Sequence, residues 1–194
     1  INGADVTNPG TAQTLTTAGA SLAGNILFAT ANTLAGSNTT IATSNATELS
    51  VLANAASTIS ASVGNTSSGI ANFSGNSSVT LSAANTYTST TFINSASLIE
   101  GTANAISTGA VTIVGGTFNL NGNSDSVGVI TATAGTIASG AGTLTTTGTL
   151  ATVANANKPT VITGTLAMPT AGAFNIADGL VEDDANISAV VTSA

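Results

Sequence analysis

The sequence predicts an all-β protein built from many short strands. Roughly one residue in five is Thr, whose branched side chain suits a pleated strand and is a poor choice inside a helix. Apolar residues make up 42% of the chain, but they are mostly Ala, Leu, Ile and Val, with five Phe, one Tyr and no Trp. We therefore expect a core of small and β-branched side chains.

Nine short segments have the alternation and the composition of half-buried strands. In chain order they are Thr40–Thr43, Ser57–Val63, Ser78–Ser82, Thr86–Ile93, Ala110–Val114, Thr117–Leu120, Val127–Thr133, Thr143–Thr147 and Thr160–Ala167. Glycine pairs and Asn-Gly steps lie between several of them, and these residues favour turns that need a positive φ. The chain therefore alternates between short strands and tight turns.

A Gly-Thr-apolar step recurs in the second half of the chain. It begins at Gly116, Gly135, Gly142, Gly148 and Gly164. These intervals are too short for strands joined by helices, so the step indicates the stacked coils of a solenoid. With coils of about 20 to 25 residues, the chain would form roughly eight or nine of them. A β-sandwich or jelly roll completed by a donated strand predicts similar strands and stays the alternative fold.

We expect one domain over residues 1–194, divided into three regions. Residues 1–55 are interpreted as a distinct N-terminal cap or assembly segment, and the Ala-rich part of it, Thr11–Ala55, leaves a short helix near Glu48–Ala56 as the less favoured alternative to a strand. Residues 56–178 would form the solenoid coils. Residues 179–194 would form an acidic turn followed by a final strand over Ile187–Thr192.

A series of motifs between Ser78 and Ile137 has a specific order. It consists of Val79-Thr80-Leu81, Asn85-Thr86-Tyr87-Thr88, Thr91-Phe92-Ile93-Asn94, Gly109-Ala110-Val111-Thr112-Ile113 and Gly116-Thr117-Phe118-Asn119-Leu120-Asn121-Gly122-Asn123. This series closely resembles the autotransporter-associated β-strand repeat of bacterial surface proteins. The resemblance covers about a third of the chain. It implies a right-handed parallel β-helix, secretion across the bacterial envelope and no catalytic residues.

Two positions depart from that family pattern. The family commonly has a Gly-Gly pair after the Asn-Thr-Tyr-Thr turn, where this chain has Ser89-Thr90. Gly also often precedes the next strand, where this chain has Ser97. We therefore expect these two turns to be built differently.

The charge balance restricts the partners of the protein. Eight acidic residues stand against one base, Lys158, giving a formal net charge of −7. Without a basic surface to neutralise phosphates, we expect no nucleic-acid partner. No apolar run approaches the roughly 18 residues of a membrane helix, so we expect no membrane-spanning segment. The absence of Cys is compatible with a secreted protein that works outside the cell or at the bacterial surface.

The sequence offers few groups for catalysis or ligand binding. It lacks His, Cys and Arg and its acids are mostly scattered, so we expect neither an enzyme nor a cofactor. Asp178, Glu182, Asp183 and Asp184 carry the oxygen ligands that Ca²⁺ prefers. Their spacing fits no standard calcium loop, so a solvated turn is the favoured interpretation and no metal site is predicted.

Two other surface patterns have simple explanations. Alternating Thr residues in Thr86–Thr90 and Thr143–Thr147 resemble the flat ladders of some ice-binding solenoids, but pairing between coils also explains them. Asn-x-Ser/Thr sites are expected by chance in a chain this rich in these residues. They begin at Asn38, Asn45, Asn65, Asn72, Asn76 and Asn186.

The leading functional hypothesis is a non-enzymatic structural subunit that assembles head-to-tail into an extracellular filament. A solenoid ends in unpaired strand edges, and both Ile1–Thr7 and Ile187–Thr192 are suited to pairing with another copy. The alternative is a monomeric passenger or adhesin stalk that holds a binding surface away from the cell. Ice binding is the third hypothesis.

Overall fold

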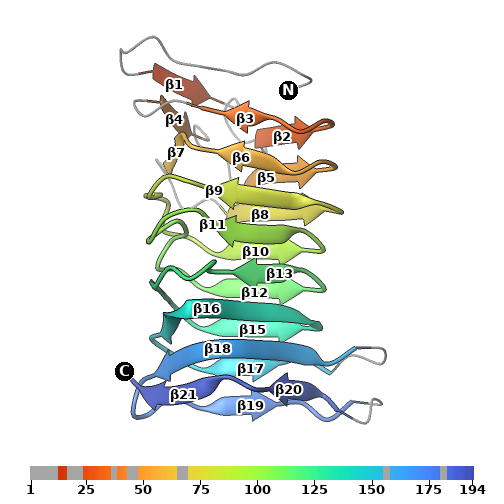
Figure 1. Ribbon diagram of the computed structural model, residues 1–194, viewed down its shortest axis with the longest axis vertical. Coiled ribbons are helices and arrows are strands. Elements are labelled where there is room, and N and C mark those ends of the chain that lie inside the picture. The colour runs from red at the N-terminus through yellow and green to blue at the C-terminus, as the bar shows by residue number, and fades with distance from the viewer. Residues whose placement is uncertain are drawn as a thin grey trace.

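The chain forms a column of stacked coils in which consecutive strands turn around a shared interior (Figure 1). A computed structural model describes residues 13–16, 24–35, 39–42, 48–64, 70–154, 158–179 and 183–194. Within this part of the chain, every regular element is a β-strand, and the coils make about seven turns. The predicted all-β solenoid is therefore confirmed.

Three parallel sheets run along the column. The first has the order β19-β17-β15-β12-β10-β8-β5-β2. Its strands are Gly24–Phe28 (β2), Glu48–Ala53 (β5), Ile70–Gly75 (β8), Thr91–Asn94 (β10), Val111–Val114 (β12), Ile130–Thr133 (β15), Leu150–Thr152 (β17) and Phe174–Ile176 (β19).

The second sheet has the order β20-β18-β16-β13-β11-β9-β6-β3. Its strands are Thr33–Leu34 (β3), Ser57–Ile59 (β6), Ser78–Leu81 (β9), Ser97–Glu100 (β11), Thr117–Asn119 (β13), Gly135–Thr146 (β16), Thr160–Met168 (β18) and Ala185–Ile187 (β20).

A third side of the column is built from shorter pieces. Gln13–Thr16 (β1), Thr39–Ala42 (β4) and Ser62–Gly64 (β7) form a three-stranded sheet at the N-terminal end. Asp125–Val127 (β14) pairs with the second half of β16, and Val190–Ser193 (β21) pairs with the second half of β18. The long strands β16 and β18 therefore contribute to two sides of the column, with a register shift between the two halves.

Parallel pairing joins each coil to the next at a nearly constant step. Val111 pairs with Ile130 and Gln13 with Thr39, so one coil takes 19 to 26 residues, close to the predicted length. The alternation of each strand then sends one set of side chains inward, where successive coils stack them in columns. One such column contains Val79, Leu98, Phe118, Ile137 and Ile162, all of which are buried.

The corner between the first two sheets uses a left-handed backbone. Ser95, Gly115 and Ala134 occupy it in three successive coils, with φ of 64°, 72° and 49°. Glycine adopts this conformation without a Cβ clash, whereas Ser and Ala carry a cost. The coils therefore keep one corner geometry although its sequence changes.

Several sequence-based expectations are wrong in detail. Glu48–Ala53 form β5 rather than a helix, because Leu49, Val51 and Ala53 alternate inward with the period of a strand. Thr86–Thr90 precede β10 instead of joining a strand, because the side chain of Tyr87 turns into the core.

The number of turns and the alternative fold also need correction. The described coils make about seven turns rather than the predicted eight or nine, because the eight strands of the first sheet span residues 24–176 and not the whole chain. The β-sandwich alternative is wrong, because all the ladders that join the described strands are parallel. Right-handedness stays a prediction.

Candidate assembly surface

The last coil, formed by β19, β20 and β21, ends all sides of the column at its C-terminal end (Figure 1). On one side, β19 pairs with β17, while β20 and β21 pair with β18. On the other side, no strand of the described chain pairs with any of the three. Their outer edges therefore present unpaired N–H and C=O groups, which can template another strand.

The same coil also leaves part of the apolar interior uncovered. Ile176 continues the inward column of Thr152, yet it is 51% exposed. Val191 continues the column of Leu166, which is 1% exposed, and is itself 49% exposed. We call Ile176, Val191 and their partly buried neighbours Phe174 and Ile187 the C-terminal end face. Its chemistry is that of the solenoid core without a covering coil.

The predicted terminal strands can be compared with this surface. The expected strand Ile187–Thr192 is divided between β20 and β21, with Ser188 and Ala189 between them. Both pieces lie at the open edge, as the head-to-tail hypothesis requires. The other expected assembly strand, Ile1–Thr7, lies outside the described residues.

The predicted acidic group lies in the loop between β19 and β20. Asp184 accepts hydrogen bonds from Gly179 N–H at its Oδ1, over 2.8 Å, and from Thr160 N–H at its carbonyl oxygen. Asp183 is exposed, and Glu182 lies outside the described residues. In the part of the chain that the structure describes, no three acidic, His or Cys side chains gather as a metal site would require.

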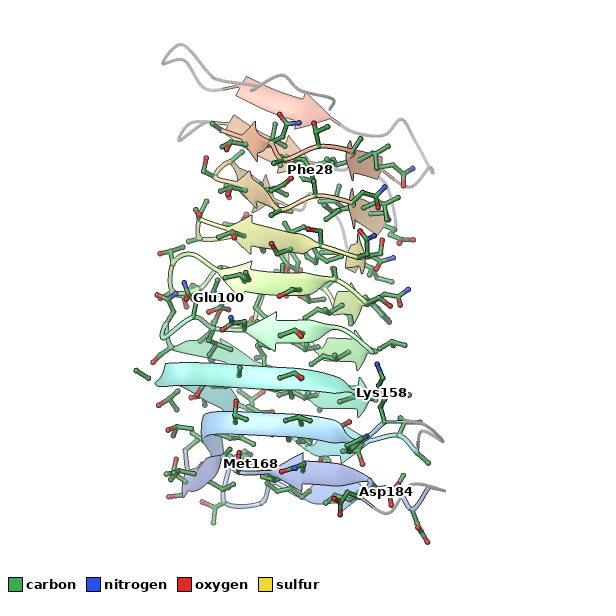
Figure 2. The ribbon with its side chains drawn as sticks, turned by 45° about the vertical axis from the view of Figure 1, so that its right-hand side comes forward. Phe28, Glu100, Lys158, Met168 and Asp184 are labelled. Atoms are coloured by element: carbon green, nitrogen blue, oxygen red, sulfur yellow. The ribbon has the colours of Figure 1, made fainter. Side chains whose placement is uncertain are left out.

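Lys158 lies beside a shallow hollow on the side of the column. The hollow has a volume of about 230 Å³ and a floor of glycine backbone, and its lining includes Gly116, Gly135, Thr117 and Thr136. Figure 2 shows Lys158 and Asp184 on the same side of the molecule, in neighbouring coils. Among the described residues that line the hollow, Lys158 is the only one with an ionisable side chain.

The two Thr runs do not form matching ladders. Thr86–Thr90 lie outside the strands, whereas Thr143 and Thr145 face outward from β16 and Thr147 follows its end. Of the Asn-x-Ser/Thr sites, Asn76 and Asn186 are exposed, and Asn72 donates a hydrogen bond to Glu48 Oε1 over 2.9 Å. The remaining sites begin at Asn38, Asn45 and Asn65, which lie outside the described residues.

The chain matches no family model, no curated protein and no solved structure. The resemblance to autotransporter repeats is therefore supported at the level of the fold, a parallel β-solenoid, and not as a family. No described helix is long and apolar enough to cross a membrane.

Two buried acids, Glu100 and Asp125, were not predicted from the sequence. Glu100 and Asp125 are 0% and 6% exposed, although both are acids. Glu100 is the last residue of β11 and Asp125 is the first residue of β14. Buried and half-buried residues alternate in both strands, and both acids take buried, inward positions. The alternation around Glu100 and Asp125 was the available signal, because it assigns both acids to the interior.

Proposed function

We propose that the protein is a non-enzymatic, extracellular structural subunit that assembles head-to-tail into a filament. The observation that carries the proposal is the C-terminal end face, where inward-pointing Ile176 and Val191 stay about half exposed. A coil of a second copy placed on this face would cover these side chains and pair with the open strands.

The architecture of the two ends supports such a contact. The described sheets end at β1, β2 and β3 at the N-terminal end and at β19, β20 and β21 at the C-terminal end. In the described chain, each side of the column therefore begins with a single strand and ends with a single strand. Stacking one end on the other would continue the sides of the column, and a contact between two different ends repeats without closing.

The composition favours the same role. Charged residues make up 5% of the chain, so repulsion between stacked copies comes from few groups. The parallel ladders run along the column, so a pulling force would act on many backbone hydrogen bonds. The extracellular location is supported by the absence of Cys and by the repeat-like motifs.

Electron microscopy of residues 1–194 tests the proposal directly. We expect filaments from this chain and isolated rods from a variant truncated after Asn186, which lacks β21. A sharper pair is Val191→Asp and its control Val114→Asp, because Val114 is a similarly exposed valine (42%) on the side of the column.

An unpaired carboxylate in the junction should weaken it strongly. We expect Val191→Asp to raise the protein concentration needed for filaments by about tenfold or more, with little effect from Val114→Asp. Sedimentation velocity would measure both. Rods that stay isolated for the unmodified chain, or equal effects of the two variants, would overturn the proposal in favour of a monomeric stalk.

A further inference from the structure

Three successive coils each place one ionisable side chain inside the column. Tyr87 follows β9, Glu100 ends β11 and Asp125 begins β14. All three are buried, at 3%, 0% and 6% exposure. Elsewhere the described interior is built mainly from Leu, Ile, Val, Ala and Phe, so this is a local polar break in an apolar core.

The two carboxyl groups have too few donors to be stable as two anions. Asp125 Oδ1 accepts a hydrogen bond from the N–H of Ser126 over 2.7 Å. Asp125 Oδ2 and both carboxyl oxygens of Glu100 accept no hydrogen bond from an N–H or hydroxyl group of the described chain. Two buried carboxylates with three unsatisfied oxygens would cost far more than one neutral acid bonded to one anion.

The surroundings of Glu100 supply no cation. In the preceding coil, Leu81 of β9 pairs with Glu100. In the following coil, Ile99 pairs with Asn119, so Leu120 takes the position next to Glu100. Asp125 is the titratable group that acts on Glu100, and both acids act on Tyr87. Tyr87 Oη lies 2.8 Å from Thr91 Oγ1. Only a proton can therefore reduce the charge of the pair.

We propose that Glu100 keeps its proton inside the solenoid and donates it in a hydrogen bond to Asp125, and that losing this proton in alkaline solution loosens the coils that carry β11 and β14. The proton leaves for solvent, and the neutral acid with its neighbouring anion becomes two facing carboxylates on successive coils. Repulsion between them then acts between neighbouring turns of the column. The stability of the coils in the middle of the column would therefore depend on pH.

The direction of the titration agrees with this geometry. Burial, then hydrogen bonding to Asp125 and its charge, raise the pKa of Glu100 from 4.5 to about 10. Because the folded pKa is the higher one, this group favours folding most below pH 4.5, and the benefit is lost as the pH rises towards 10. Burial raises the pKa of Tyr87 to about 12, so Tyr87 stays neutral throughout this window.

The composition makes the effect easy to isolate. The chain has no His and no Cys, so no side chain with an unperturbed pKa titrates between about pH 6 and pH 8. The α-amino group also titrates near this range and is common to every variant. A change of stability that Glu100→Gln removes therefore belongs to the buried pair.

Urea unfolding of the full chain, followed by circular dichroism at a series of pH values, tests the proposal. We expect the unfolding constant of the unmodified chain to rise with pH between about 5 and 9, by at most tenfold per unit. Glu100→Gln and Asp125→Asn should flatten this rise, whereas Asp183→Asn, which changes an exposed acid, should keep it. A rise of equal slope in Glu100→Gln would overturn the proposal.

A second measurement guards against variants that fail to fold. The infrared carbonyl band of a protonated carboxylic acid should persist in the unmodified chain at about pH 8, where ordinary carboxyl groups are ionised. If this band is absent while the chain is folded, Glu100 does not keep its proton. Neither measurement depends on filament formation, so this pH dependence and the proposed assembly can fail separately.

Discussion

The two ends of the column differ in how well their inward side chains are covered, and at the N-terminal end β1 pairs with β4. In the N-terminal coil, formed by β2, β3 and β4, Phe28 and Leu34 are 0% exposed and Ile26 is 5% exposed. In the C-terminal coil, formed by β19, β20 and β21, Ile176 and Val191 are about half exposed. Both sets of side chains occupy inward positions, so the difference comes from their neighbours and not from their own strands.

This difference shows how a solenoid distributes its stability. Each coil contacts only the coils before and after it, so an inner coil has two interfaces and the C-terminal coil has one. Fully burying a side chain such as Val or Ile is worth about 1.5–3 kcal/mol. Covering two half-exposed side chains would therefore contribute about 2 kcal/mol, and the rest must come from backbone pairing and the wider contact.

The largest test of this difference compares two phenylalanines. Phe28→Ala removes a fully buried ring from the N-terminal coil and should lower the free energy of unfolding by about 3–5 kcal/mol. Phe174 lies partly buried in β19, so Phe174→Ala should cost about 1 kcal/mol in the isolated rod. Urea denaturation of the monomer would measure both. Equal costs would mean that the C-terminal coil is as well covered as the N-terminal one.

A second test uses two glycines with different surroundings. A Cβ at Gly75 would lie 2.2 Å from the carbonyl oxygen of Ala53, and its φ of +116° already disfavours other residues. Gly75→Ala should therefore destabilise the chain by about 3 kcal/mol. A Cβ at Gly172, before β19, would lie 2.9 Å from the carbonyl oxygen of Pro169, without a left-handed φ.

The expected cost of Gly172→Ala is smaller, about 1 kcal/mol, because its turn meets the solvent at the open coil. Thermal unfolding of the two variants beside the unmodified chain would rank them. A larger loss at Gly172 would contradict the idea that the C-terminal coil tolerates change.

Much of the fold is predictable from local patterns. Strands such as β9, β12 and β13 follow from the alternation of small polar and apolar residues, and the recurring Gly-Thr-apolar step indicates stacked coils. A short helix stayed an alternative for the segment of β5, because a short Ala-rich segment has weak local preference. Its pairing with β2 and β8 decides its conformation.

The ends and the acid pair depend on contacts that local patterns do not encode. The alternation in β21 is similar to that of inner strands, and only the stacking order leaves Val191 uncovered. Glu100 and Asp125 are brought together because they lie on successive coils. To recognise the pair from the sequence, one must know which residues of each strand point inward and how each coil runs around the interior.

The smallest expected effect concerns the acidic loop beside the open end. Asp183 is exposed, and Asp184 uses Oδ1 to accept a hydrogen bond from Gly179 N–H, an acceptor that Asn also provides. Because exposed charges interact weakly through water, Asp183→Asn with Asp184→Asn should change the concentration needed for filaments by about twofold or less. Sedimentation at several salt and Ca²⁺ concentrations would measure this change. A strong dependence on Ca²⁺ that disappears in the double variant would contradict a solvated turn and make this loop part of the junction.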